Sequence, residues 1–156
     1  MPAAGQRAFL VYWFPVLIWM GIIFLMSTGL GSGSNTSRIL VPLLNFIFGD
    51  VSEETIAALR LVVRKFAHVV EYAILSGLVW RALAKPQKNV DVWENKGAWL
   101  TLMICALYAA SDEFHQSFVD GRVGTPVDVM IDTVGIVSAL AMIWIWQTRR
   151  RTIPLG

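Results

Sequence analysis

Ionisable side chains recur at helical spacing around residue 68. Lys65, His68, Glu71 and Tyr72 read K-x-x-H-x-x-E-Y, and spacings of three and four place side chains along one face of an α-helix. A carboxylate one turn from an imidazole orients the ring and raises its basicity, as in general bases and metal-bound histidines. The pattern predicts that His68 and Glu71 form an acid-base pair. The alternative is a hydrogen bond that only satisfies polar groups within a helix bundle.

Two basic residues flank this segment. Lys65 is expected either to bind an anionic ligand or to extend toward lipid headgroups, as long cationic side chains do at membrane surfaces. Arg64 is expected to be a membrane anchor that points outward.

A second group of polar residues lies in the segment S-D-E-F-H-Q at 111–116. The spacing predicts that Asp112 pairs with His115 and that Glu113 pairs with Gln116. Both histidines of the chain, at 68 and 115, have acidic neighbours, so a metal site with nitrogen and oxygen ligands is one interpretation. The spacing matches no specific metal motif, and the metal and any cofactor are left unassigned. A plain helix end is the other interpretation.

The third group follows in the connector F-V-D-G-R-V-G-T-P and the helix after it. Arg122 on this short loop either binds a phosphate or carboxylate through two hydrogen bonds or neutralises a nearby acid. Asp128 and Asp132 are four residues apart and project from one helix face, where a buried position demands a cation or a proton.

Acids outnumber fixed cations when the three groups are counted together. The acids are Glu71, Asp112, Glu113, Asp128 and Asp132, and the cations are Lys65 and Arg122. Bound protons, a histidinium or a bound cation are therefore expected to balance the charge.

The elements that must position these residues belong to a membrane protein. The chain has 156 residues, of which 56% are hydrophobic and only 15% charged, whereas soluble domains are about a quarter charged. One domain, residues 1–156, is expected at this length. The single cysteine, Cys105, excludes an intramolecular disulfide and a cysteine-based zinc site. A net charge of +2 gives no reason to expect nucleic-acid binding.

The first predicted span is the uncharged run from Ala8 to Met26, which is long enough to cross the hydrocarbon core. A Gly/Ser-rich extramembrane loop is expected over 27–37. The apolar segment 39–48 is only half a span long, so an interfacial or re-entrant segment is expected there. Ser52 and the following Glu53, Glu54 and Thr55 resemble a helix start.

The remaining spans have uncharged cores that are too short, or that contain acids. Phe66–Trp80 reaches spanning length only with His68 and Glu71 inside it, and Ala98–Ser111 requires the residues from 112 to 115. Charged groups inside a membrane face the bundle interior and pair. The sequence therefore predicts an all-α, four-helix transmembrane bundle with spans at about 8–27, 64–84, 97–115 and 126–147.

Basic residues predict the orientation of this bundle. Placing both termini and the loop between the second and third spans on one side collects Arg7, Arg81, Lys85, Lys88, Lys96, Arg149, Arg150 and Arg151. The excess of Lys and Arg on cytoplasmic loops then predicts cytoplasmic termini and an outward-facing polar site. Helical spans favour a multi-pass protein of an inner or sole cytoplasmic membrane over an outer-membrane barrel.

The polar segments resemble the VanZ-like family of bacterial membrane proteins. The resemblance rests on R-K-F-A-H-V-V-E-Y-A-I-L at 64–75 and on S-D-E-F-H-Q-S-F-V-D-G-R-V-G-T-P-V-D-V-M-I-D-T-V-G at 111–135. Family members commonly carry D-E-x-x-Q-x-x-x-x-x-R and then D-x-x-x-[ND]-x-x-G. Those positions are held here by Asp112, Glu113, Gln116, Arg122, Asp128, Asp132 and Gly135. Asp132 is acidic where asparagine is frequent, and Asp120 stands where proline is usual.

The resemblance implies a shared site more firmly than a shared activity. The family's namesake is associated with resistance to the glycopeptide teicoplanin, a property that the resemblance alone does not carry over. We expect a site for an anionic lipid-linked or peptidoglycan precursor or a glycopeptide. Lys65, Tyr72, Gln116, Arg122, Asp128 and Asp132 are the expected binding residues, and His68, Glu71, Asp112 and Glu113 the expected catalytic ones.

Two other functions fit the sequence. One is a non-enzymatic envelope interaction protein whose polar cluster is structural, and the other is a small proton-coupled carrier, less favoured because no inverted repeat is visible. Whether the chain is an enzyme and whether it forms a homo-oligomer stay open at this point.

Overall fold

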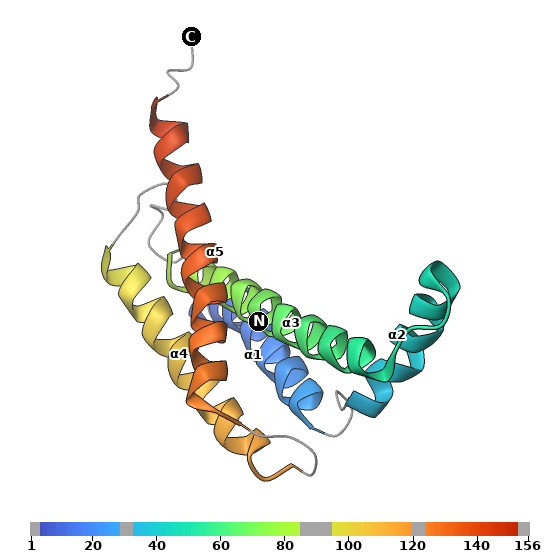
Figure 1. Ribbon diagram of the computed structural model, residues 1–156. Helices are drawn as coiled ribbons and strands as arrows, with labels where there is room; N and C mark the ends of the chain where they lie inside the picture. The colour runs from blue at the N-terminus through green and yellow to red at the C-terminus, as the bar shows by residue number, and fades with distance from the viewer. Residues whose placement is uncertain (1–3, 29–32, 85–94, 120–123, 153–156) are drawn as a thin grey trace.

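The computed structural model describes residues 4–28, 33–84, 95–119 and 124–152, and within these ranges it is all-helical. The helices are α1 (Ala4–Ser27), α2 (Gly33–Phe48), α3 (Glu53–Ala84), α4 (Asn95–Gln116) and α5 (Pro126–Thr152). Figure 1 shows α1, α3, α4 and α5 gathered together, with α2 apart from them beside the start of α3. The prediction of an all-α fold is confirmed.

Helix α3 is the centre of the arrangement, since it contacts each of the other four helices. Its most extensive contact is with α5. The inward faces supply an apolar core that includes Val16, Leu75, Val79, Ala109 and Ile136. Large apolar side chains on the outward faces of α1, α4 and α5 are exposed, as expected where the surrounding medium is lipid and not water.

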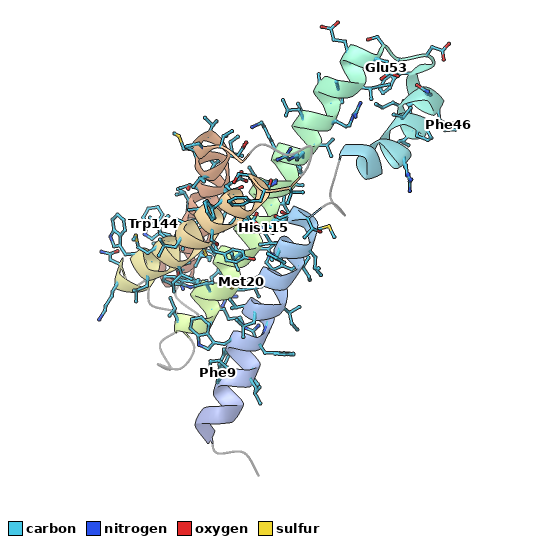
Figure 2. The ribbon with its side chains drawn as sticks, turned by 90° about the horizontal axis from the view of Figure 1, so that it is seen from below. Phe9, Met20, Phe46, Glu53, His115 and Trp144 are labelled. Atoms are coloured by element: carbon cyan, nitrogen blue, oxygen red, sulfur yellow. The ribbon has the colours of Figure 1, made fainter. Side chains whose placement is uncertain are left out.

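Helix α3 is longer than the predicted span of 64–84. Its 32 residues extend about 48 Å at the usual helical rise, well beyond a hydrocarbon core of roughly 30 Å. The predicted helix start is correct, because the Ser52 hydroxyl accepts a hydrogen bond of 3.3 Å from the Thr55 amide. Figure 2 shows the first part of α3, marked by Glu53, projecting with α2 beyond the end of α1.

Helix α2 corrects the expected extent of the loop. Residues 33–37 belong to a 16-residue helix, so the segment between α1 and α2 is shorter than the predicted loop of 27–37. Ser, Asn and Thr favour the first turn of a helix as well as loops, which explains the error. The apolar stretch 39–48 forms the second part of this helix, and its interfacial or re-entrant position stays a prediction.

Three described helices are long and apolar enough to cross a membrane: Phe9–Ser27, Glu53–Ala84 and Pro126–Arg150. Helix α4 has 22 residues, a sufficient length, but it does not meet the same requirement for hydropathy and charge. A fourth crossing by α4 therefore stays a prediction.

Two hydrogen bonds fix α1 against its neighbours. The Trp19 indole donates to the Glu71 carbonyl over 2.9 Å, and the Tyr108 hydroxyl donates to the Met20 carbonyl over 2.6 Å. Both acceptors are backbone carbonyls, so the bonds set the depth of α1 relative to α3 and α4. The C-terminal end of α1 is thereby placed beside the C-terminal end of α4.

Candidate functional site

Polar side chains from four helices meet at one end of the bundle. The site lies where α1 and α4 end and α5 begins, against the middle of α3. Buried polar residues concentrate there and comprise Ser27, Asp112, Glu113, Gln116 and Asp132. The sequence predicts such a gathering, because its apolar runs are too short to span lipid alone.

The centre of the site is a cluster of His68, Glu113 and Asp132, here called the central triad. His68 Nδ1 lies 3.1 Å from Asp132 Oδ1 and 3.9 Å from Glu113 Oε1. The two acids are almost fully buried, with 4% of Glu113 and none of Asp132 exposed. The imidazole therefore faces two carboxylates from two other helices.

Two close backbone approaches assemble the central triad. A side chain at Gly135 would collide with the Val69 carbonyl, and one at Gly124 would collide with the Glu113 carbonyl. Gly135 brings α5 against α3 next to His68, and Gly124 brings the start of the α5 segment against the end of α4. Small residues are needed where helices approach this closely in membranes.

Lys65 and Asp128 form the rim of the site and are here called the rim pair. The Lys65 ammonium donates to Asp128 Oδ1 over 2.7 Å, with side-chain exposures of 38% and 19%. The Thr125 hydroxyl donates to Asp128 Oδ2 over 2.8 Å. Asp128 thus has the cationic partner that its position demands.

A chain of hydrogen bonds, here called the bridging chain, joins α1, α3 and α4. The Ser27 hydroxyl donates to Asp112 Oδ2 over 2.7 Å. The Gln116 amide nitrogen lies 3.1 Å from both Ser27 Oγ and Asp112 Oδ2, and donates to each. Arg64 completes the chain by donating to Gln116 Oε1 over 3.1 Å.

A cavity of about 220 Å³ opens between α3 and α5. It is lined by Leu61, Arg64, Lys65, His68, Asp128, Ile131 and Asp132. The cavity therefore connects the rim pair with the His68 and Asp132 side of the central triad. Its two fixed cations stand on α3 and its two carboxylates on α5. A larger cavity of about 400 Å³ between α4 and α5 has an almost wholly apolar lining, including Trp99, Leu102, Val137 and Trp144.

Several buried polar atoms have no hydrogen-bond partner of good geometry among the described residues. They include both carboxylate oxygens of Glu113, Oδ2 of Asp132, Oδ1 of Asp112 and the Tyr72 hydroxyl. The Thr125 backbone contributes a weaker polar interaction with Glu113, and Tyr72 interacts electrostatically with Asp112, Glu113 and Asp132. Unpaired polar atoms are rare in protein interiors and call for an explanation.

The structure rearranges the pairs predicted from sequence. The hydrogen-bond partner of His68 Nδ1 is Asp132 of α5 and not Glu71 of its own helix. Asp112 pairs with Gln116, four residues away, whereas the predicted spacing was three. His115 lies against α1, where its ring stacks on Phe24 at 4.6 Å between centroids, and Figure 2 shows its place at the α1–α4 contact.

Eight of the ten predicted site residues lie together: seven belong to the central triad, the rim pair or the bridging chain, and Tyr72 lies near the acids of these groups. They are Lys65, His68, Tyr72, Asp112, Glu113, Gln116, Asp128 and Asp132. Glu71 adds its charge to the surroundings of His68. Arg122 lies outside the described residues.

Two members of the site escaped the sequence analysis. Arg64 points toward Gln116, so the prediction of an outward-pointing anchor is wrong. Ser27 was assigned to the loop after α1. Its only sequence signal is its place as the first hydroxyl after an apolar run, a common feature of helix ends.

One family of known proteins matches this chain. The family model described as VanZ/LLP1 matches residues 12–147, which is most of the chain. The chain belongs to the VanZ/LLP1 family. No curated protein and no solved structure matches it.

The matched region of this VanZ/LLP1 protein contains every residue of the bridging chain, the rim pair and the central triad. The family resemblance noted in the sequence is therefore confirmed. The positions that carry that resemblance converge in space, since Asp112, Glu113, Gln116, Asp128 and Asp132 all lie at this end of the bundle. Imidazole and carboxylates at such a place can transfer protons or hold a cation.

Proposed function

We propose that this VanZ/LLP1 protein binds the anionic headgroup of a lipid-linked cell-envelope precursor in the cavity between α3 and α5. The observation that carries the proposal is that Arg64 and Lys65 line one cavity together with His68. Two adjacent cations beside a partly buried recess suit a phosphate or carboxylate, since guanidinium and ammonium groups are the usual ligands of such anions.

The rim pair suits a ligand that arrives from outside. Lys65 is the more exposed partner, and a partly exposed ion pair contributes only about 0–1 kcal/mol to stability. A phosphate can therefore displace Asp128 from the ammonium at small cost. Arg64 has guanidinium nitrogens in addition to the one that donates to Gln116, so it can contact the same anion.

The surroundings of the cavity suit a lipid tail. Leu61 and Ile131 form part of its lining, and the nearby apolar side chains of Phe66, Val127 and Met130 are exposed on α3 and α5. A lipid chain would remain on this outer surface while its headgroup enters the cavity. An outward-facing cavity with cytoplasmic termini, as the basic residues predict, would meet headgroups of the outer leaflet.

Lipid binding to the purified protein tests the proposal. Native mass spectrometry in detergent would compare retention of a polyprenyl phosphate with that of a zwitterionic phospholipid of similar mass. We expect preferential retention of the phosphate by the wild type, and at least a tenfold loss of affinity in Lys65→Gln, because a charge-assisted hydrogen bond contributes about 1.5–3 kcal/mol. Lys96→Gln, which removes an exposed lysine at the other end of α4, is the matched control.

Equal retention of both lipids, or equal losses in the two variants, would exclude the proposal. A glycopeptide added to the same samples tests the other expected ligand class. If the glycopeptide binds equally well to the wild type and to Lys65→Gln, its binding site lies elsewhere on the protein.

The bridging chain favours a second candidate, a non-enzymatic interaction protein whose polar network specifies helix packing. Its members join three helices, and Gln116 is completely buried. In that case Lys65→Gln would leave lipid retention unchanged, whereas Gln116→Ala would lower the thermal unfolding midpoint. The effect of Lys65→Gln on lipid retention therefore separates the two candidates.

A further inference from the structure

We infer that His68, Glu113 and Asp132 form a binding site for a divalent transition-metal ion at the floor of the cavity. The protein itself would hold this cation, whether or not a headgroup binds. The possible ligand atoms of the central triad, one from each residue, all lie within 4.8 Å of one another.

The distances within the central triad suit a shared ion. Ligand atoms at about 2.0–2.2 Å from a metal ion lie roughly 3–4 Å from each other. His68 Nδ1 is 3.1 Å from Asp132 Oδ1 and 3.9 Å from Glu113 Oε1. An ion among these atoms would replace the proton between His68 and Asp132 and would draw the Glu113 carboxylate toward them.

The second observation is the state of Glu113. Its side chain is 96% buried, as follows from an exposure of 4%. Neither carboxylate oxygen has a hydrogen-bond partner of good geometry among the described residues, and Asp132 Oδ2 also has none. The neighbours of the Glu113 carboxylate are the Thr125 backbone, which contributes a weaker polar interaction, and the His68 imidazole at 3.9 Å. A buried carboxylate with so few partners suits a cation ligand, because buried charges are usually paired or bound to metal.

The charges of the cluster point the same way. Lys65 already pairs with Asp128, and Arg64 donates to the bridging chain. Within the described residues, His68 is the group left to balance Glu113 and Asp132 when both are ionised, and a histidinium supplies only one charge. A divalent ion with a neutral imidazole neutralises both carboxylates.

The ligand set selects the class of metal. Imidazole favours zinc, iron, nickel and copper, whereas carboxylates alone favour magnesium, calcium and manganese. One imidazole with two carboxylates therefore suits Zn²⁺ or Mn²⁺ better than Mg²⁺. Three protein ligands leave at least one coordination position open, as in catalytic zinc sites. His68 and Asp132 line the cavity, so that open position would face it.

Metal binding by untagged, chelator-treated protein in detergent tests the inference. Isothermal titration with Zn²⁺, Mn²⁺ and Mg²⁺ would measure affinity, and elemental analysis after desalting would measure stoichiometry. We expect about one equivalent of Zn²⁺ or Mn²⁺ in the wild type. Glu113→Gln, Asp132→Asn and His68→Gln should bind at least tenfold more weakly, because loss of even an outer-shell partner of a metal ligand usually weakens binding by about tenfold or more. Glu53→Gln and His115→Gln, which change the same residue types outside the cluster, should bind like the wild type.

Co²⁺ added to the wild type gives a measurement that needs no variant to fold. Visible absorption bands of a low-symmetry nitrogen and oxygen site, abolished by Zn²⁺ in competition, would support the inference. It would be overturned by a wild type that binds none of these ions, by absence of the Co²⁺ bands, or by undiminished binding in folded Glu113→Gln and Asp132→Asn. Equal loss in the two control variants would also overturn it.

Discussion

The backbone carbonyl of Val69 lies against Gly135 so closely that even a methyl group on the glycine would overlap it. This contact joins α3 to α5 one residue after His68 and three residues after Asp132. It therefore sets the helix register that brings the imidazole within 3.1 Å of the carboxylate.

Replacing this glycine should separate the two helices. We expect Gly135→Ala to lower the free energy of unfolding by about 1–3 kcal/mol, the usual cost of overpacking. It should also lower the binding affinity for any ligand that requires the His68–Asp132 contact. Thermal unfolding in detergent measures the stability. The matched control is Gly77→Ala on α3, where an added methyl group meets nothing within 4 Å and helix propensity favours alanine. Equal destabilisation by both changes would contradict the prediction.

The rim pair should matter to ligand binding more than to folding. We expect Lys65→Met to reduce stability by less than about 1 kcal/mol, because a partly exposed ion pair is weak. A double-mutant cycle with Asp128→Asn measures the coupling between the two side chains directly. A coupling energy above about 3 kcal/mol, in the range of pairs removed from water, would show that the rim pair is a structural ion pair.

The bridging chain should be the most sensitive polar network to truncation. Gln116→Ala leaves Asp112 and Arg64 without the partner that lies between them, so we expect a loss of about 1–3 kcal/mol in the free energy of unfolding. Ser117→Ala is the control, because that exposed hydroxyl donates to the Phe114 carbonyl three residues earlier and, among the described residues, joins no other helix. Urea or thermal unfolding of both variants compares them, and a Gln116→Ala protein as stable as the control would disprove the ranking.

Removal of the Tyr72 hydroxyl, unlike truncation of Gln116, should not destabilise the protein. Its hydroxyl is buried without a partner among the described residues, so Tyr72→Phe removes an unpaired polar group while keeping the ring in the core. We expect the unfolding midpoint to stay the same or rise. A fall in the midpoint would show that the hydroxyl makes a stabilising interaction in the membrane protein.

Cysteine labelling can decide whether α4 crosses the membrane. In a Cys105→Ala background, we expect Ser117→Cys and Glu53→Cys to react in whole cells with a membrane-impermeant maleimide. Lys96→Cys should react only after the cells are opened. This outcome follows from an outward-facing site with cytoplasmic termini. Reaction of positions 96 and 117 from the same side would remove α4 from the transmembrane helices.

The sequence predicted where polar residues gather better than which of them pair. Helical spacing and the shortness of the apolar runs were sufficient to place the residues around His68, Glu113 and Asp132 at one end of the bundle. Pairing depends on the register between helices. That register is set by the contact of Gly135 with Val69, two residues that are 66 positions apart in the sequence. Spacing along one helix therefore suggested Glu71, whereas the partner lies on α5.

The errors in the elements have the same physical origin. Ser, Asn and Thr serve both loops and the first turns of helices, so the start of α2 was assigned to a loop. Arg64 resembles a headgroup anchor in the sequence, because its partner Gln116 lies on a different helix, α4. Ser27 gains its role only because α1 ends next to Asp112.

The central triad draws one ligand atom from each of three helices, and the last of these, α5, is also the last to be synthesised. When synthesis has reached the end of α4, His68 and Glu113 are present, yet the helix that supplies Asp132 and packs against α3 is missing. His68 and Glu113 therefore lack part of their cover until α5 packs against α3 and α4.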